Sequence, residues 1–210
     1  LEMMDKATTR AVEEFVHAGY DLEAETILLC ESDGTPEEVA EEIERMTKVL
    51  EQAGASGIQI SQNEAERLKF WSGRKNAFPA AGRLAPDYYC MDGTIPRRNI
   101  GTLLRRIQGM EKKYGLGCLN VFHAGDGNMH PTIVHDHGDL EAQKRAIAAF
   151  GEIVEIAQSL GGTASGEHGI GSIKQRFAAD ELSPAVIELQ RSIKRAFDPK
   201  GILNPGKKLP

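Results

Sequence analysis

The run Asn120-Val121-Phe122-His123-Ala124-Gly125-Asp126-Gly127-Asn128-Met129-His130 decides how this chain folds. Residues 117–123 and 129–134 are the apolar stretches on either side of its glycine-rich centre, and their length and composition are typical of strands. Asp126-Gly127 is a preferred two-residue turn of a β-hairpin. The run therefore predicts two antiparallel strands joined by a tight turn.

The same run places two histidines close together. If Asp126 and Gly127 alone form the loop, His123 faces His130 across the hairpin, with Cβ atoms about 5 Å apart. That separation lets two imidazole nitrogens bind one metal ion at about 2.1 Å each. A looser loop is also possible, because glycine at 125 and 127 permits it. On one continuous strand the two side chains would face opposite sides.

A third ligand is available in Gly166-Glu167-His168-Gly169-Ile170-Gly171. Glycines let the backbone take unusual dihedrals and approach a ligand closely. In such an irregular loop, adjacent side chains can reach one site in different roles. A set of two histidines and one carboxylate leaves coordination positions open for a substrate.

Other interpretations of these residues were weighed. A single histidine at a strand end is usually structural, but two of them bracketing Gly-Asp-Gly-Asn leave the metal site and the structural interpretation open. A calcium-binding EF-hand loop is excluded, because neither its glycine nor its final glutamate falls in place. A dinucleotide-binding loop at residues 166–171 is excluded by its glycine spacing.

Outward from the hairpin, helix and strand patterns alternate. Helices are predicted at residues 1–18, 35–53, 63–74, 97–114, 140–160 and 183–197. Further strands are predicted at 25–30, 57–62 and 88–91, and residues 76–96 are mostly a loop. This order predicts an α+β fold with a ferredoxin-like antiparallel sheet, helices on one face of it, and a C-terminal helix followed by an irregular tail.

Composition narrows the function classes. The 210 residues carry a net charge of −6, which gives no basic surface for nucleic acid. Three cysteines at irregular spacing suit a reducing compartment, and no segment has the length and hydropathy to span a bilayer or act as a signal peptide. We therefore expect a cytoplasmic protein. The chain opens inside a predicted helix, so we also expect a piece of a longer protein.

Three motifs together resemble one known family. They are residues 123–130, residues 166–171, and the terminus Asp198-Pro-Lys-Gly-Ile-Leu-Asn-Pro-Gly-Lys207. In this order they are similar to the C-terminal domain of FAD-linked oxidases, within the vanillyl-alcohol-oxidase-like flavoproteins. The resemblance covers essentially the whole chain. The segments 71–79 and 87–96 are most similar to the glycolate oxidase branch of that family.

The resemblance implies a role for each site residue. It makes His123, His130 and Glu167 the ligands of a divalent metal (zinc, manganese or iron) and His168 the active-site base. It makes Arg74 the binder of the substrate carboxylate, for which a guanidinium is suited. Asn204 belongs to a tail that packs near the flavin. Cys90 and Thr132 replace a lysine and an asparagine found in relatives that oxidise hydroxy-diacids, which implies a smaller substrate.

The resemblance also implies a function for the whole parent protein. It would oxidise a 2-hydroxy acid such as glycolate or D-lactate, with hydride transfer to FAD. Residues 1–171 would form the substrate domain with the metal site, and residues 172–210 would pack on an N-terminal FAD-binding domain. The chain by itself would then hold no FAD and be inactive. Other oxidase subunits would be partners, and contact with the inner membrane would occur through them.

Two other functions were considered. One is a metal- or ligand-binding sensor domain without catalysis, and the other is a metal-assisted hydrolase that uses the same three ligands and water. The tail at residues 197–207 favours the flavoprotein, because neither a sensor nor a hydrolase needs a segment that docks on a flavin domain.

Overall fold

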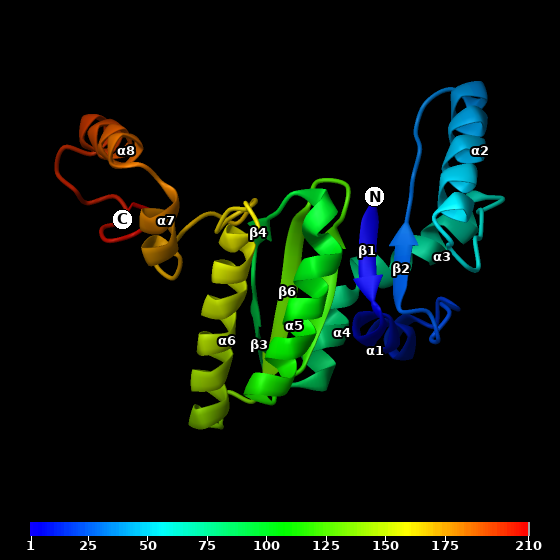
Figure 1. Ribbon diagram of the computed structural model, residues 1–210, viewed down its shortest axis with the longest axis horizontal. Coiled ribbons are helices and arrows are strands. Elements are labelled where there is room, and N and C mark those ends of the chain that lie inside the picture. The colour runs from blue at the N-terminus through cyan, green and yellow to red at the C-terminus, as the bar shows by residue number, and fades with distance from the viewer. Residues whose placement is uncertain (210) are drawn as a thin grey trace.

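A computed structural model describes residues 1–209 as one six-stranded antiparallel sheet with helices around it (Figure 1). The strand order is β2-β1-β5-β6-β3, and β4 also pairs with β6. The strands are β1 (Glu2–Asp5), β2 (Thr26–Leu29), β3 (Asp87–Cys90), β4 (Gly93–Thr94), β5 (Cys118–His123) and β6 (Asn128–His135). The helices are α1 (Lys6–Val16), α2 (Pro36–Gln52), α3 (Glu64–Lys75), α4 (Ala77–Leu84), α5 (Ile100–Tyr114), α6 (Leu140–Ser159), α7 (Gln175–Glu181) and α8 (Pro184–Phe197).

The predicted α+β class with an antiparallel sheet is confirmed, but helices cover both of its faces. Helices α5 and α6 pack on one face, where Phe122 belongs to the larger core. Helices α1 and α4 pack on the other, where Val121 belongs to a smaller core. Successive residues of a strand point to opposite faces, and both of these are buried. A sheet that is apolar on both sides needs two covering layers, so the expectation of helices on one face is corrected.

The hairpin forms with a longer loop than predicted. Val121 pairs with His130 and His123 pairs with Asn128, so residues 124–127 all lie in the turn. Gly127 has φ +74° and lies so close to Ile95 that a Cβ atom would stand 2.1 Å from its carbonyl oxygen. The register in which His123 faces His130 directly is therefore wrong. The looser loop keeps both on one face, as diagonal neighbours.

Three local predictions also needed correction. Residues 2–5 form a strand and not the start of a helix, because they pair with both β2 and β5, and Asp5 then caps α1 through the backbone N–H of Thr8. Residues 57–62 pair with no strand. Helix α4 lies in the predicted loop; its Pro79 stands in the first turn, where no helical hydrogen bond is lost.

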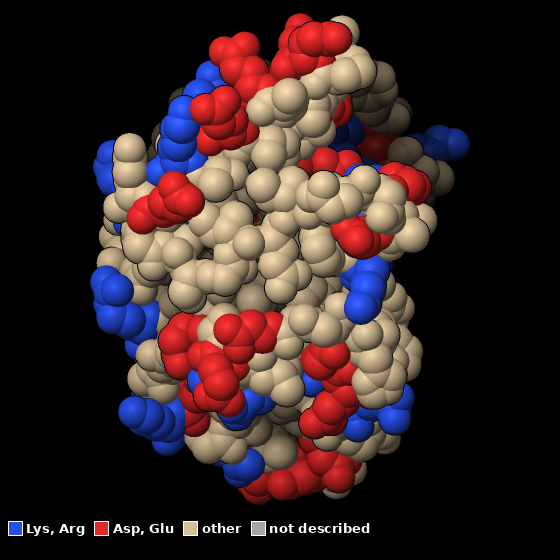
Figure 2. Space-filling model, turned by 90° about the vertical axis from the view of Figure 1, so that its right-hand side faces the viewer, with Lys and Arg blue, Asp and Glu red and all other residues tan. Residues whose placement is uncertain are grey.

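The two ends of the molecule differ from its centre. Helix α8 buries no residue; its last residue, Phe197, is 83% exposed, and Ile202 in the tail after it is 70% exposed. Figure 1 shows α8 and the tail lying beyond α6, apart from the sheet. Figure 2 looks on the opposite side, where charged groups surround a broad uncharged area. Within residues 1–209 no helix combines the length and apolarity that crossing a membrane requires.

Candidate metal and substrate site

Two histidines from neighbouring strands meet on the face of the sheet that α1 and α4 cover. The ring centroids of His123 and His130 are 5.4 Å apart. The His130 side chain is 3% exposed and that of His123 is 32% exposed, so the pair runs from the interior to the surface. The strand register fixes both Cα positions before any ligand binds.

Each imidazole is oriented through its Nδ1 atom. His130 Nδ1 lies 3.3 Å from the carbonyl oxygen of Met91, and His123 Nδ1 lies 2.8 Å from a carboxylate oxygen of Glu2. A carbonyl and an ionised carboxylate only accept hydrogen bonds, so Nδ1 donates in both rings. Burial lowers the pKa of His130 and favours its neutral form. The Nε2 lone pair of His130 then faces Glu167, and that of His123 also has Arg74 Nη2 at 3.4 Å; both could bind a cation, as in carboxylate–histidine–metal triads.

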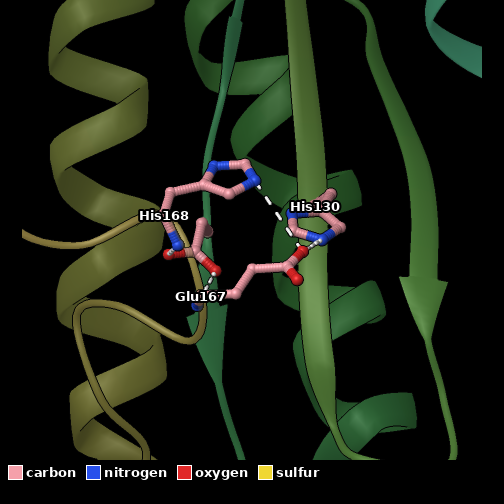
Figure 3. Close-up of side chains that lie close together, drawn as sticks. His130, Glu167 and His168 are labelled. Carbon is pink, nitrogen blue, oxygen red and sulfur yellow. Dashed lines mark hydrogen bonds and ion pairs between the residues drawn. The ribbon is translucent and has the colours of Figure 1, made fainter.

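Glu167 reaches both rings from the glycine-rich loop, and Figure 3 shows its carboxylate beside His130. Its Oε1 atom lies 2.9 Å from His130 Nε2 and 3.6 Å from His123 Nε2. Three atoms bound to one ion at about 2.1 Å are about 3.0–3.5 Å apart, which these separations approach. With Nδ1 protonated in each ring, the three atoms carry only lone pairs, so a proton or a metal ion must lie among them. The donor set therefore fits a divalent cation such as zinc, manganese or iron.

His168 stands beside this set without an anchor of its own. Its ring stacks on that of His130, with centroids 5.0 Å apart and planes 14° apart. Its Nε2 atom is 3.8 Å from Glu167 Oε1, beyond hydrogen-bond distance, and half of its side chain is exposed. The structure thus brings together all four residues predicted from the two glycine-rich motifs, with one of them open to a substrate.

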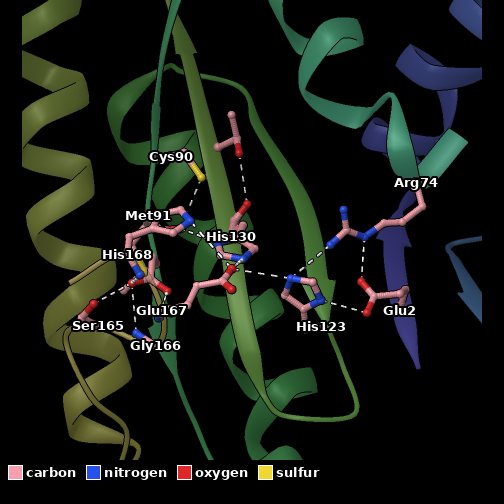
Figure 4. A network of polar contacts seen from close by, with 12 residues as sticks. Glu2, Arg74, Cys90, Met91, His123, His130, Ser165, Gly166, Glu167 and His168 are labelled. Carbon is pink, nitrogen blue, oxygen red and sulfur yellow. Dashed lines mark hydrogen bonds and ion pairs between the residues drawn. The ribbon is translucent and has the colours of Figure 1, made fainter.

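Arg74 reaches the site from α3 and is linked to it through Glu2 (Figure 4). The Arg74 Nε atom lies 2.7 Å from Glu2 Oε2, and its Nη2 atom lies 3.4 Å from His123 Nε2. The Glu2 carboxylate thus accepts hydrogen bonds from both the His123 ring and the Arg74 guanidinium, and its side chain is only 14% exposed. Sequence analysis missed Glu2 because residues 1–18 were assigned to a helix, and only the pairing of β1 with β5 places it here.

A second carboxylate, also missed, organises the loop that carries Glu167 and His168. Asp92 is fully buried and accepts hydrogen bonds from the backbone N–H groups of residues 166, 167 and 168. Burial by itself raises the pKa of Asp92, but these bonds, that from Ser165 Oγ and the Lys174 ammonium group hold it well below its usual range. Asp92 is therefore an anion whose oxygens are occupied. One ligand atom each of Asp92, His130, Glu167 and His168 lies within 4.8 Å of the others, a group to which His123 does not belong.

The floor beside His130 is small and uncharged. Cys90 pairs with Thr132 across β3 and β6, and the two-residue alternation puts both on the face of His130. Burial raises the pKa of the Cys90 thiol, which keeps it neutral. The two positions singled out by the resemblance thus border the site and add no second cation to it.

Asn204 is not brought to this site. It lies on the exposed tail after α8 with a left-handed backbone, φ +48°. Figure 1 separates that tail from the sheet by α6 and α7. Its predicted contact with a flavin therefore needs a surface outside the described residues.

Comparison with known proteins shows the family of this chain. Residues 1–208 match the family described as FAD linked oxidases, C-terminal domain. The chain belongs to that family. The flavoprotein-type domain is 50% identical, over its full length, to the glycolate oxidase subunit GlcD of Escherichia coli strain K12, of which it covers 42%. It is 28% identical, again over its full length, to the mitochondrial D-lactate dehydrogenase (cytochrome) of Arabidopsis thaliana, of which it covers 37%.

The FAD-linked oxidase domain therefore spans less than half the length of these relatives. A solved structure, that of 4-ethylphenol oxidase from Gulosibacter chungangensis, has the same fold, with a TM-score of 0.72 at 17% identity. It matches 99% of this chain and 46% of that one. At such identity the likeness concerns the fold alone.

Proposed function

We propose that this FAD-linked oxidase domain is the substrate-binding half of an FAD-dependent oxidoreductase that acts on small 2-hydroxy acids, of the glycolate or D-lactate type. One observation carries the proposal. His123 Nε2 and His130 Nε2 both lie within 3.6 Å of Glu167 Oε1, and a fourth group, His168, lies beside them. A metal-binding set with an adjacent base suits an acid whose carboxylate and hydroxyl chelate a cation.

The three converging residues would hold the metal, and His168 would take the proton. A bound divalent metal supplies Lewis acidity, which eases loss of the substrate hydroxyl proton. Imidazole exchanges protons readily near neutral pH, and the His168 ring is accessible and unanchored. FAD in the parent protein supplies the acceptor for the hydride. Zinc, manganese and iron all bind such mixed nitrogen and oxygen donors.

Arg74 and the residues beside His130 would select the substrate. Arg74 has one carboxylate partner, Glu2, and a 3.4 Å contact from Nη2 to His123 Nε2, so its other N–H groups would meet the carboxylate of a substrate. Cys90 and Thr132 offer no charge to a second carboxylate. The site therefore suits a monocarboxylate with a short chain.

The apolar C-terminal segment is where the N-terminal FAD-binding half would dock. Leu189, Ile193, Phe197, Ile202 and Leu203 are each at least 50% exposed, which a free surface rarely tolerates in one contiguous stretch. Residues 172–210 would then form the interface, with Asn204 near the flavin. The proposal places the enzyme in the cytoplasm, with other oxidase subunits as further partners and as its link to the inner membrane.

The visible absorption spectrum of the full-length parent tests this proposal. Anaerobic addition of glycolate or D-lactate should bleach the oxidised flavin band. Acetate and propionate, which lack the hydroxyl, should leave the band unchanged. Prior removal of metal with a chelator should slow the bleaching, and readdition should restore it. Metal-dependent hydrolysis of an added ester, without any response of the flavin band to 2-hydroxy acids, would instead support the hydrolase, and metal binding without any turnover would support the sensor.

A further inference from the structure

We propose that Asp92 is a positioning residue, whose carboxylate wraps residues 165–168 around itself so that Glu167 and His168 both face the hairpin histidines. The inference rests on the proposed function for its effect on catalysis. Its structural part stands on contacts within the chain. No neighbouring pair of side chains on a regular strand could share one site, since they point to opposite faces.

The contacts converge on one carboxyl group. Asp92 Oδ2 accepts bonds from Ser165 Oγ at 2.7 Å and from the backbone nitrogens of Gly166 and His168 at 3.0 Å each. Its Oδ1 atom accepts from the backbone nitrogen of Glu167 at 3.0 Å. Three consecutive N–H groups that point at one centre force the backbone to curl around it. The side chains of Glu167 and His168 are then turned outward, toward His130.

Asp92 is itself placed by the strand that carries His130. Cys90 pairs with Thr132 and Gly93 pairs with Met129 in one register, so Asp92 faces His130 in the gap between β3 and β4. Pro131 has no N–H to give to the Met91 carbonyl, and that carbonyl accepts from His130 Nδ1 instead. Met91 thus orients His130 through its carbonyl oxygen, and Asp92 orients the loop through its carboxylate.

Close packing holds the loop against the hairpin. A Cβ atom on Gly166 would stand 2.5 Å from Asn128 Oδ1 and 2.7 Å from Thr94 Oγ1, so only glycine fits. Thr163 donates to the carbonyl of Thr94 at 2.8 Å. These contacts fix the distance of the loop from the strands, and the carboxylate of Asp92 fixes its curl.

Lys174 balances the buried charge. Its ammonium group lies 2.6 Å from the Asp92 carbonyl oxygen and 3.2 Å from Oδ2, and its side chain is 7% exposed. A buried charge left without its partner is strongly destabilising. Lys174 makes no contact with Glu167 or His168 among the bonds of residues 1–209, so charge balance and loop curvature can be separated by mutation.

The test uses the full-length parent oxidase with four variants: Asp92→Asn, Lys174→Met, the double variant, and Asp136→Asn as control. Asp136 also accepts a backbone N–H, but on an exposed turn. An amide puts an NH2 group where one carboxylate oxygen accepts, so one loop N–H loses its partner if Oδ1 is replaced and two lose theirs if Oδ2 is replaced. The double variant removes both buried charges, which restores stability without restoring the lost acceptor.

Two readouts follow the loop directly. The first is amide hydrogen exchange of a peptide spanning residues 165–168, measured without metal. The second is titration of the metal-free protein with Co²⁺, followed by its visible d–d bands. Asp92→Asn and the double variant should exchange faster and bind Co²⁺ roughly 10–100-fold more weakly, as expected when a group that orients a ligand is lost. Lys174→Met leaves Asp92 as an unpaired buried charge and should destabilise the fold, but it keeps every acceptor of the loop, so the folded protein should bind Co²⁺ within about threefold of wild type. The control should stay within about threefold of wild type in both readouts.

The outcomes separate the two proposals. Wild-type exchange protection in Asp92→Asn, or recovery of Co²⁺ affinity in the double variant, would overturn the positioning role and leave a structural ion pair. Loss of protection in both Asp92 variants would support it, even if the wild-type protein bound no Co²⁺ and its flavin did not respond to 2-hydroxy acids. That last result would contradict the proposed function alone.

Discussion

The four residues at the site come from two regions that are built differently. His123 and His130 lie on paired strands, and their positions follow from a ladder of backbone hydrogen bonds between residues close in sequence. Glu167 and His168 lie in a loop without regular structure, whose main anchor, Asp92, is more than 70 residues away in the chain. A change within the hairpin therefore acts locally, and a change at a distance can move the loop.

The two regions also differ in how far their side chains are exposed. The His130 side chain is 3% exposed, while those of Glu167 and His168 are about half exposed. Strand pairing holds His123 and His130 in place, whereas Glu167 and His168 on the loop are accessible to solvent. We expect the hairpin to determine whether a cation binds, and the loop to determine both binding and proton transfer.

The largest effect should come from the loop residue that binds no metal. His168→Ala in the full-length parent should slow flavin reduction by roughly 10²–10⁴, the usual contribution of a general base. Metal content should not change. Single-turnover flavin bleaching and metal analysis check both points, with the exposed His137→Ala as control. Loss of metal in the His168 variant, with retention in Glu167→Ala, would exchange the two roles.

The ligands of the two regions should behave alike toward metal. His123→Ala and Glu167→Ala should each weaken Co²⁺ binding by more than about 100-fold, beyond the loss of an orienting partner. Two remaining ligands hold a cation poorly. Calorimetric titration of metal-free protein measures this. If Glu167→Ala binds as tightly as wild type, the hairpin alone forms the site and the loop supplies only the base.

Substitution of one glycine in each region tests whether the hairpin turn is more rigid than the loop. Gly127 and Gly169 both have a positive φ, but only Gly127 has a backbone oxygen where a Cβ would stand. Gly127→Ala should lower the free energy of unfolding by about 3 kcal/mol, from dihedral strain and overlap together. Gly169→Ala should lower it by about 1–2 kcal/mol, from the dihedral alone. Urea denaturation of the full-length protein measures both; equal losses would show that the turn relaxes.

Glu2 should matter through orientation. Glu2→Gln retains shape but weakens the hold on His123 Nδ1 and on Arg74. Metal affinity should fall roughly 10–100-fold, and the KM for glycolate should rise because Arg74 loses its position. Glu14, exposed on α1, supplies the control variant Glu14→Gln. An unchanged affinity with a raised KM would restrict Glu2 to placing Arg74.

The smallest effect should come from α8, which buries no residue. In the 210-residue chain, Phe197→Ser should change the free energy of unfolding by less than about 0.5 kcal/mol, because its ring is 83% exposed. Phe150→Ser, at 7% exposure in the core, should cost about 3 kcal/mol or more. In the full-length parent Phe197→Ser should cost more than in the chain alone. Equal costs in both would argue against docking through α8.

Local sequence determined the hairpin and most helices. Thr35, Asn63 and Ser183 cap the helices that they were predicted to begin, since a cap depends on residues within one turn. The glycines around Asp126 specified a turn. The predicted register was wrong, because His123 pairs with Asn128, two positions before His130. The two-residue alternation of the strands nevertheless keeps both histidines on one face. Residue types at fixed spacing were enough to single out His123, His130, Glu167 and His168.

Tertiary structure decided what no local pattern contains. Glu2 became a strand residue through its pairing with β2 and its neighbour's pairing with β5, and only then a partner of His123. Asp92 lies in a polar stretch of the sequence that carries no motif, and only the fold buries it beneath the loop. Hydrogen bonds between residues more than 70 positions apart leave no periodicity in the sequence. The sequence therefore indicated the groups proposed for the chemistry, and the fold determined which carboxylates lie beside them.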